Sequence, residues 1–365
     1  MALPEPPPEP ETTRPPEPYE ESSQFRHWKL TSEELQHLRQ KVNEEGAERV
    51  RKAFEEQRKL ILMVEFQKIT GDTTQEPPEC LTWEEQLTYC QFYEGRILDY
   101  CKALHFDRFV QATALAYFKR FYLRNTVMDY DPKFYLMTCV FLSTKVENAH
   151  ISLSKFLESI PKSPSPDVMV ELEFSLSKGI RFEYMVHHPF WPLHGFLLDV
   201  QDYIATSHPR PAHEHLYQKL QKCYSRAEQF ASIATLTDLT FTHMPSQIGL
   251  GCLLAAARER DFEKELEQYL ASRFHEKLDD LVKLRIALDG VAKAVTMQTE
   301  KNVDKATAAA IHKKLQKCQN PDFDPTSALC KHRRREEERE RNERAAEKHE
   351  AGKAREAEQN ATFIL

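Results

Sequence analysis

The sequence predicts an all-α fold, and three observations lead to that prediction. Glycine is scarce: the chain holds nine glycines in 365 residues, whereas average proteins contain about 7%. Tight turns, hairpins and phosphate-binding loops use glycine for its positive φ, but helices need none. Apolar side chains recur at helical spacing from residue 31 to residue 298. Several of these segments open with N-cap residues or proline, as helices do.

In the first half, capping residues mark where helices begin. Thr31 and Glu34 form a capping-box pattern that opens a helix running towards Leu62. The helix that begins at Asp131 contains FYLMTCVFLSTKVEN, which is apolar nearly all round, so it should be a central buried helix. We expect Gly179 to end another helix in the left-handed conformation. The remaining helices of this half are expected over residues 82–104, 107–124 and 167–178.

The second half begins after a break at His187-His188-Pro189 and again consists of predicted helices. Its helices are expected from residue 190, over 212–237, from 245, over 261–275 and over 276–298. The segments FVQATALAYFKRF and PSQIGLGCLLAAA occupy similar places in the two halves, and their small residues let neighbouring helices approach closely. Because the halves share no evident sequence identity, a structural repeat is inferred from helix order alone. The expected divisions are an N-terminal helix and linker (22–80), two helical units (81–187 and 188–298) and a helical extension (299–330).

Both ends of the chain differ in composition from its middle. Residues 1–21 hold eight of the 21 prolines, interleaved with glutamate, and should form an extended, disordered tail. Residues 331–365 are rich in arginine, glutamate, lysine and alanine. This charged tail has no face to bury, although i,i+4 pairs could support a solvated helix. Its basic start, residues 331–335, fits a nuclear localisation patch or simply the beginning of that solvated helix.

Composition also excludes several function classes. The net charge of −7, from 50 basic and 57 acidic residues, argues against a chain-wide basic field for nucleic acid or anionic membrane. Glycine-rich nucleotide-binding loops are absent from the sequence, and no pattern of a catalytic nucleophile is found. The eight cysteines form no C-x-x-C pair, which indicates reduced thiols. His213 and His215 fall on different helix faces and suit a single metal poorly. We therefore expect no catalysis, no cofactor, no metal site and no membrane partner.

Three residues near helix ends leave two interpretations open. On the 167–178 helix, Glu173 and Phe174 lie beside the core stripe rather than on it. An aromatic next to a carboxylate suits a partner surface, but Phe174 could equally pack on a neighbouring helix while Glu173 is solvated. Lys145 ends the apolar helix, where a cation complements the helix dipole.

A resemblance to a known family bears on these residues. AYFKRFYLRNTV followed by LMTCVFLSTKVEN resembles the cyclin box, the five-helix unit by which cyclins bind their kinases. SSQFRHWKLTSEELQHLR, HHPFWPLHGFLLDV and TDLTFTHMPSQIGLGCLLAA resemble the H-type members of that family. The likeness covers about residues 22–320. It implies two tandem five-helix cyclin folds flanked by N- and C-terminal helices and disordered charged tails.

The resemblance also implies partners and a location. An H-type cyclin is a non-enzymatic regulatory subunit of the kinase that activates cyclin-dependent kinases and phosphorylates the RNA polymerase II tail. The expected partners are that kinase's catalytic subunit, a RING-finger assembly subunit and the core of transcription factor IIH, in the nucleus. Direct sequence-specific binding to nucleic acid is not expected. Two alternatives stay open: a cyclin C-like transcriptional cyclin of another kinase, and a DNA-binding general factor like transcription factor IIB.

The resemblance assigns the family's kinase-binding residues to positions in this sequence. The conserved lysine and glutamate correspond to Lys145 in STKVEN and Glu173 in ELEFSL. The remaining residues assigned to the kinase-binding surface are Val146, Glu147, Phe174, Phe182 and Tyr184.

The chain departs from the cell-cycle cyclins at two places. Arg96 matches the family's first-helix arginine and is expected to form a structural ion pair, but Lys119 replaces the usual aspartate partner. The pair must therefore be made differently. Gly95 and Lys102 occupy positions of the substrate-docking patch, so short-motif docking is doubtful. Ser163-Pro164 and Ser165-Pro166 fit either proline-directed phosphorylation sites or a proline-shaped loop.

Overall fold

The computed structural model describes residues 19–65, 78–160, 163–209, 212–298 and 303–362, with side chains as far as residue 353. Within these ranges the chain is helical and contains no strand, as the sequence predicts. Most of the proline-rich tail predicted over residues 1–21, and residues 66–77 of the predicted N-terminal helix and linker (22–80), lie outside the described residues.

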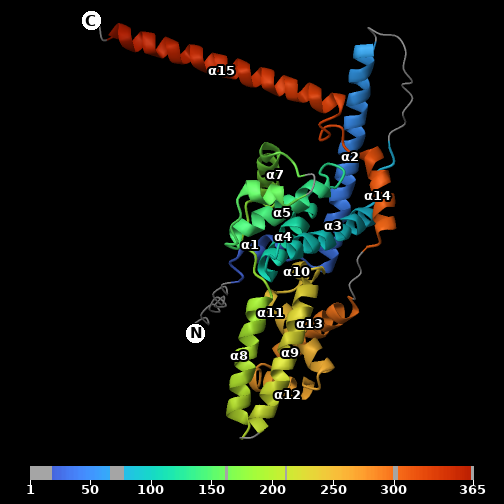
Figure 1. Ribbon diagram of the computed structural model, residues 1–365, viewed down its shortest axis with the longest axis vertical. Helices are drawn as coiled ribbons and strands as arrows, with labels where there is room; N and C mark the ends of the chain where they lie inside the picture. The colour runs from blue at the N-terminus through green and yellow to red at the C-terminus, as the bar shows by residue number, and fades with distance from the viewer. Residues whose placement is uncertain (1–18, 66–77, 161–162, 210–211, 299–302, 363–365) are drawn as a thin grey trace, which may run out of the picture.

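The first group of helices packs around a central pair (Figure 1). α4 and α5 lie against each other and are covered by α3 and α7. Asp131 caps α5 through Lys133 N at 2.9 Å with Pro132 in the first turn, and α5 is buried along most of its length, as predicted. The helices that precede and form this group are α1 (Ser23–Trp28), α2 (Ser32–Glu65), α3 (Trp83–Ala103), α4 (Arg108–Tyr122), α5 (Pro132–Val146), α6 (Leu153–Glu158) and α7 (Pro166–Gly179).

The second group lies end to end with the first (Figure 1). α11 is its centre and packs against α9, α13 and α8. Its small residues are needed for that packing: a Cβ on Gly251 would meet the Val291 side chain at 2.6 Å, and one on Gly249 would meet Pro189 O at 2.9 Å. The helices of this group are α8 (Phe190–Ser207), α9 (Ala212–Ala234), α10 (Leu239–Thr242), α11 (Pro245–Glu259), α12 (Glu263–Arg273) and α13 (Leu278–Met297).

Two helices follow the second group and return to the first. α14 (Lys305–Cys318) packs on α3, where Lys314 Nζ bonds the Glu85 carboxylate at 2.9 Å. α15 (Ala328–Thr362) starts against α2 and then projects away from the helical groups as a single long helix (Figure 1). Arg333 ties its base to Glu56 of α2 at 2.6 Å. The solvated charged helix allowed by the sequence is therefore what this segment forms.

Several predicted boundaries are wrong, each for a local reason. α7 begins at Pro166 rather than Asp167, because Ser165 is its N-cap. Gly179 is not left-handed: it stays in the helix, where a Cβ would lie 2.5 Å from the Phe121 ring. The left-handed residues are Arg181 and Phe182, with φ of 62° and 58°. α9 ends at Ala234, short of the expected residue 237.

Candidate functional site

Lys145 and Glu173, the residues that the cyclin resemblance singles out, meet at the surface of the first helical group. Lys145 lies in the last turn of α5 and Glu173 in the second half of α7. Lys145 Nζ donates a hydrogen bond to Glu173 Oε1 at 2.5 Å, and it also lies 4.5 Å from the centre of the Phe141 ring. An exposed ion pair of this kind contributes about 0–1 kcal/mol. Lys145 and Glu173 can therefore separate and form bonds with a partner protein at a small cost in free energy.

An exposed apolar patch adjoins this ion pair. Phe174 is 64% exposed and Phe182 is 53% exposed, and their ring centres lie 6.3 Å apart. Val170 and Met185 are also exposed. Clustered large apolar side chains with nothing to cover them mark interaction sites. Phe174 therefore does not pack into the protein, and its contact with a partner stays a prediction.

The backbone after α7 turns Phe182 outward. Phe182 N donates to Ser177 O at 2.7 Å, which ends the helix in a left-handed turn made of Arg181 and Phe182. Left-handed backbone costs about 1–2 kcal/mol per non-glycine residue. Glu183 helps to hold the turn: its carboxylate accepts Trp28 Nε1 at 2.6 Å and lies 3.4 Å from Arg181 Nε.

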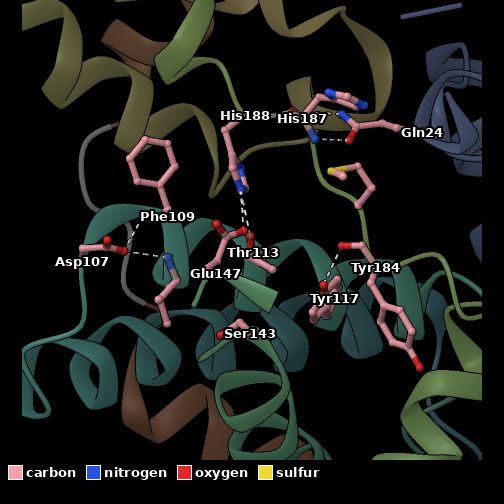
Figure 2. Close-up of polar contacts among 12 residues, drawn as sticks. Gln24, Asp107, Phe109, Thr113, Tyr117, Ser143, Glu147, Tyr184, His187 and His188 are labelled. Carbon is pink, nitrogen blue, oxygen red and sulfur yellow. Dashed lines mark hydrogen bonds and ion pairs between the residues drawn. The ribbon is translucent and has the colours of Figure 1, made fainter. Parts of the chain in front are cut away.

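The other residues predicted for the kinase-binding surface are less exposed to solvent. Val146 and Tyr184 are half-buried and pack against the core of the first group. The Tyr184 carbonyl accepts the Tyr117 hydroxyl at 2.6 Å (Figure 2). Glu147 turns inward: it accepts a hydrogen bond from Thr113 Oγ1 at 2.5 Å and lies 3.6 Å from His188 Nε2 (Figure 2). The structure therefore brings Lys145, Glu173, Phe174 and Phe182 together and sets Glu147 apart from them.

The interhelical ion pair is made differently from that of cell-cycle cyclins. Arg96 does form an ion pair, but with Asp99 of its own helix, at 3.2 Å on the surface. The pair that joins α3 to α4 is Glu94 with Lys119, 3.4 Å apart, and both side chains are buried. Burial raises the pKa of Glu94, and the charge of Lys119 opposes that rise. The negative charge of this pair lies on α3 and the positive charge on α4, the reverse of the arginine–aspartate pair expected from the family. Lys119, in place of the aspartate, indicated this difference in the sequence.

A clamp between α1 and the 183–188 segment was missed by sequence reasoning. The buried Arg120 guanidinium donates to the carbonyls of Glu183 and Met185 at 3.2 and 3.3 Å, and to Gln24 Oε1 at 3.0 Å. Gln24 in turn accepts His187 N at 2.8 Å (Figure 2). Burial lowers the pKa of Arg120 to about 10. The N-terminal stretch that contains Gln24 contributed to the family resemblance, but nothing local in the sequence assigns it this role.

The described part of the chain contains neither a membrane-spanning helix nor a cluster of metal ligands. No helix there combines the length and apolarity needed to cross a bilayer. Nor do three His, Cys, Asp or Glu side chains gather there in a group that could hold a metal ion. All eight cysteines are free thiols, and burial raises the pKa of most of them, including Cys252 and Cys318.

Comparisons with protein families and sequences agree with this architecture. Residues 60–184 match the cyclin N-terminal domain, and residues 188–320 match the cyclin C-terminal domain. Cyclin mcs2 of Schizosaccharomyces pombe is 32% identical over 331 residues, which covers 90% of this chain and 94% of the relative. Cyclin-H of Xenopus laevis is 29% identical over 308 residues, covering 82% and 86%.

Comparison with solved structures points the same way. One neighbour comes from the CAK complex of Chaetomium thermophilum bound to ATP-gamma-S: TM-score 0.69, 27% identity, covering 88% of this chain and 94% of that one. Another comes from yeast TFIIK, the Kin28/Ccl1/Tfb3 complex: TM-score 0.56, 28% identity, covering 75% and 100%. The chain therefore belongs to the cyclin family, and its likeness within that family is to the H type.

Proposed function

We propose that this chain is the cyclin subunit of a CDK-activating kinase. The observation that carries the proposal is the Lys145–Glu173 pair beside the exposed Phe174 and Phe182, on a chain whose relatives are cyclins. The structural neighbours belong to a CAK complex and to yeast TFIIK. Their likeness supports three partners for this chain: a cyclin-dependent kinase, a RING-finger assembly subunit and transcription factor IIH. It also supports a nuclear location and a regulatory rather than catalytic role.

The mechanism is a shift of the kinase between two conformations. Kinase catalysis requires an ion pair between a strand lysine and a glutamate on the kinase's C helix. A subunit that binds only the state with that helix turned inward shifts the population by its differential affinity. Lys145 and Glu173 would release each other and hydrogen-bond kinase backbone around the C helix. Phe174 and Phe182, with the half-buried Val146 and Tyr184 behind them, would supply apolar contact area.

The first prediction concerns the ion pair. Replacing both members, Lys145→Ala with Glu173→Ala, should weaken binding of the kinase catalytic subunit by about 2–5 kcal/mol, because kinase groups that the pair satisfies would be left unpaired. The measurement is the dissociation constant by calorimetry or interferometry. Thermal stability of the free chain should change little, since the pair is exposed.

A matched control exists in the second helical group. Arg226 and Glu259 also form an exposed ion pair between two helices, at 2.7 Å, and Arg226 also lies over an aromatic ring, 4.2 Å from the centre of Phe230. Arg226→Ala with Glu259→Ala should leave kinase affinity unchanged. Equal loss of affinity in both double variants, or loss in neither, would show that the kinase does not bind through Lys145 and Glu173.

A further inference from the structure

A buried polar relay lies at the C-terminal end of α5, two residues beyond Lys145, where the two helical groups join. It consists of Thr113 on α4, Glu147 at the end of α5 and His188 at the start of the second group (Figure 2). Thr113 Oγ1 lies 2.5 Å from Glu147 Oε1 and 2.8 Å from His188 Nε2. The Phe109 and Phe190 rings flank the imidazole, each with its centre 6.0 Å away, so the relay is largely shielded from solvent.

The direction of the hydrogen bonds in the relay follows from proton counting. A threonine hydroxyl has one proton, and the short contact assigns it to the Glu147 carboxylate. His188 Nε2 must then carry a proton and donate it to Thr113 Oγ1. His188 and the Thr113 hydroxyl beside it lower the pKa of Glu147, in keeping with an ionised carboxylate. Every member of the relay thus has a partner, which is what a buried polar group requires.

The relay is attached to the end of α5 through Glu147. Glu147 is the C-cap residue of that helix, its N–H donates to Ser143 O at 2.9 Å, and Asn148 follows with a left-handed φ of 56°. Residues two positions apart in a helix point to different sides. Accordingly Glu147 points inward to Thr113, while Lys145 points outward to Glu173. Holding Glu147 therefore fixes the rotation of the turn and with it the direction of Lys145.

The geometry points to His188 as a positioning residue: through Thr113 and Glu147 it holds Lys145 in place for kinase binding. This inference rests on the function proposed above. It makes the start of the second helical group part of the binding site, because His188 follows the clamped His187 and is joined to α8 through Pro189, the N-cap of that helix. It also gives Glu147 a role different from the direct kinase contact expected from the family.

The test is a double-mutant cycle measured as kinase affinity of the full-length chain. His188→Leu removes the donor and keeps an apolar side chain, and we expect it to weaken binding of the kinase catalytic subunit about tenfold. In a Lys145→Ala background the same change should cost less than about twofold, because its effect passes through Lys145. His188→Gln, which restores an N–H donor, should recover affinity to within about threefold of the unchanged chain.

The outcomes separate this inference from the proposed function. If Lys145→Ala weakens binding but His188→Leu weakens it further by the same factor as in the unchanged chain, the relay acts elsewhere and the inference is overturned. Failure of His188→Gln to recover affinity would overturn it as well. If Lys145→Ala has no effect at all, the proposed binding site fails and the inference fails with it. Should His188→Leu not fold, Thr113→Val breaks the same relay with an isosteric side chain and takes its place in the cycle.

Discussion

At the scale of single residues, the charged side chains divide into buried groups that hold the fold and exposed groups that are free to bind. Glu94 and Lys119 are buried together, whereas Lys145 and Glu173 lie at the surface. Breaking a buried pair by removing one member leaves an uncompensated charge in the interior, while an exposed pair contributes little to stability. Removing one member of the buried pair should therefore lower stability, whereas removing the exposed pair should leave stability nearly unchanged and weaken binding.

The buried pair gives a stability prediction. Lys119→Met should lower the free energy of unfolding by about 3–5 kcal/mol, because Glu94 is left without its cation. The double variant Lys119→Met with Glu94→Leu should recover most of that loss, since an apolar pair of similar size avoids the desolvation penalty. Chemical denaturation of the three proteins measures the difference. A double variant as unstable as Lys119→Met alone would show that packing, not the unpaired charge, is responsible.

The same pair predicts a pH dependence. Burial raises the pKa of Glu94, with Asp238 adding to the rise and Lys119 and Arg39 opposing it. A carboxyl with a raised folded-state pKa binds more protons folded than unfolded, so stability falls as pH rises above its ordinary value of 4.5. Removing Lys119 removes an opposing charge and enlarges this effect. The loss of stability in Lys119→Met should therefore be smaller at pH 5 than at pH 7, in the same denaturation experiment.

At the scale of secondary-structure elements, two glycines in helices offer a matched pair. Gly179→Ala should destabilise the protein by about 1–3 kcal/mol, because the new Cβ would lie 2.5 Å from the Phe121 ring. Gly290 lies in α13 with nothing within 4 Å of an added Cβ. Gly290→Ala should stabilise it by up to about 1 kcal/mol, the helix propensity difference. Thermal unfolding measures both, and shifts of the same sign would contradict this account.

Helices with a local signal were predictable from the sequence, and those without one were not. Thr31, Asp107 and Asp131 cap helices as predicted, because N-cap chemistry depends only on residues within one turn. α1 and α6 are six residues each, too short to show a helical period. The prediction of a left-handed Gly179 was wrong because glycine is needed there to leave room for the Phe121 ring, which is far away in the sequence.

The candidate site also contains residues that could be predicted from the sequence and residues that could not. Lys145 and Glu173 could be located by motif, and helical position placed Phe174 off the core stripe. The inward turn of Glu147 could not be predicted, because it depends on Thr113 and on His188, which precedes the second helical group. The same holds for the clamp on the 183–188 segment, which needs Gln24 and Arg120 from two different helices. Contacts between distant segments are what a single sequence does not display.

At the scale of the whole molecule, the N-terminal helices bind both groups together. Trp28 and Leu35 share a small apolar cluster with Leu123 of the first group and Phe241 of the second. Arg39 of α2 makes a bidentate pair with Asp238, at 2.7 and 2.8 Å. These contacts fix the first helical group, which carries Lys145, relative to the second group.

We propose that this chain switches on a kinase through the surface formed by Lys145, Glu173, Phe174 and Phe182. The most direct measurement titrates the catalytic subunit of a CDK-activating kinase with the full-length chain and follows phosphate transfer to a polymerase-tail peptide. We expect kinase activity to rise to a plateau at one chain per kinase, and the Lys145→Ala, Glu173→Ala double variant to need a much higher concentration to reach that plateau. Activity that does not rise, or that rises identically with the double variant, would contradict it.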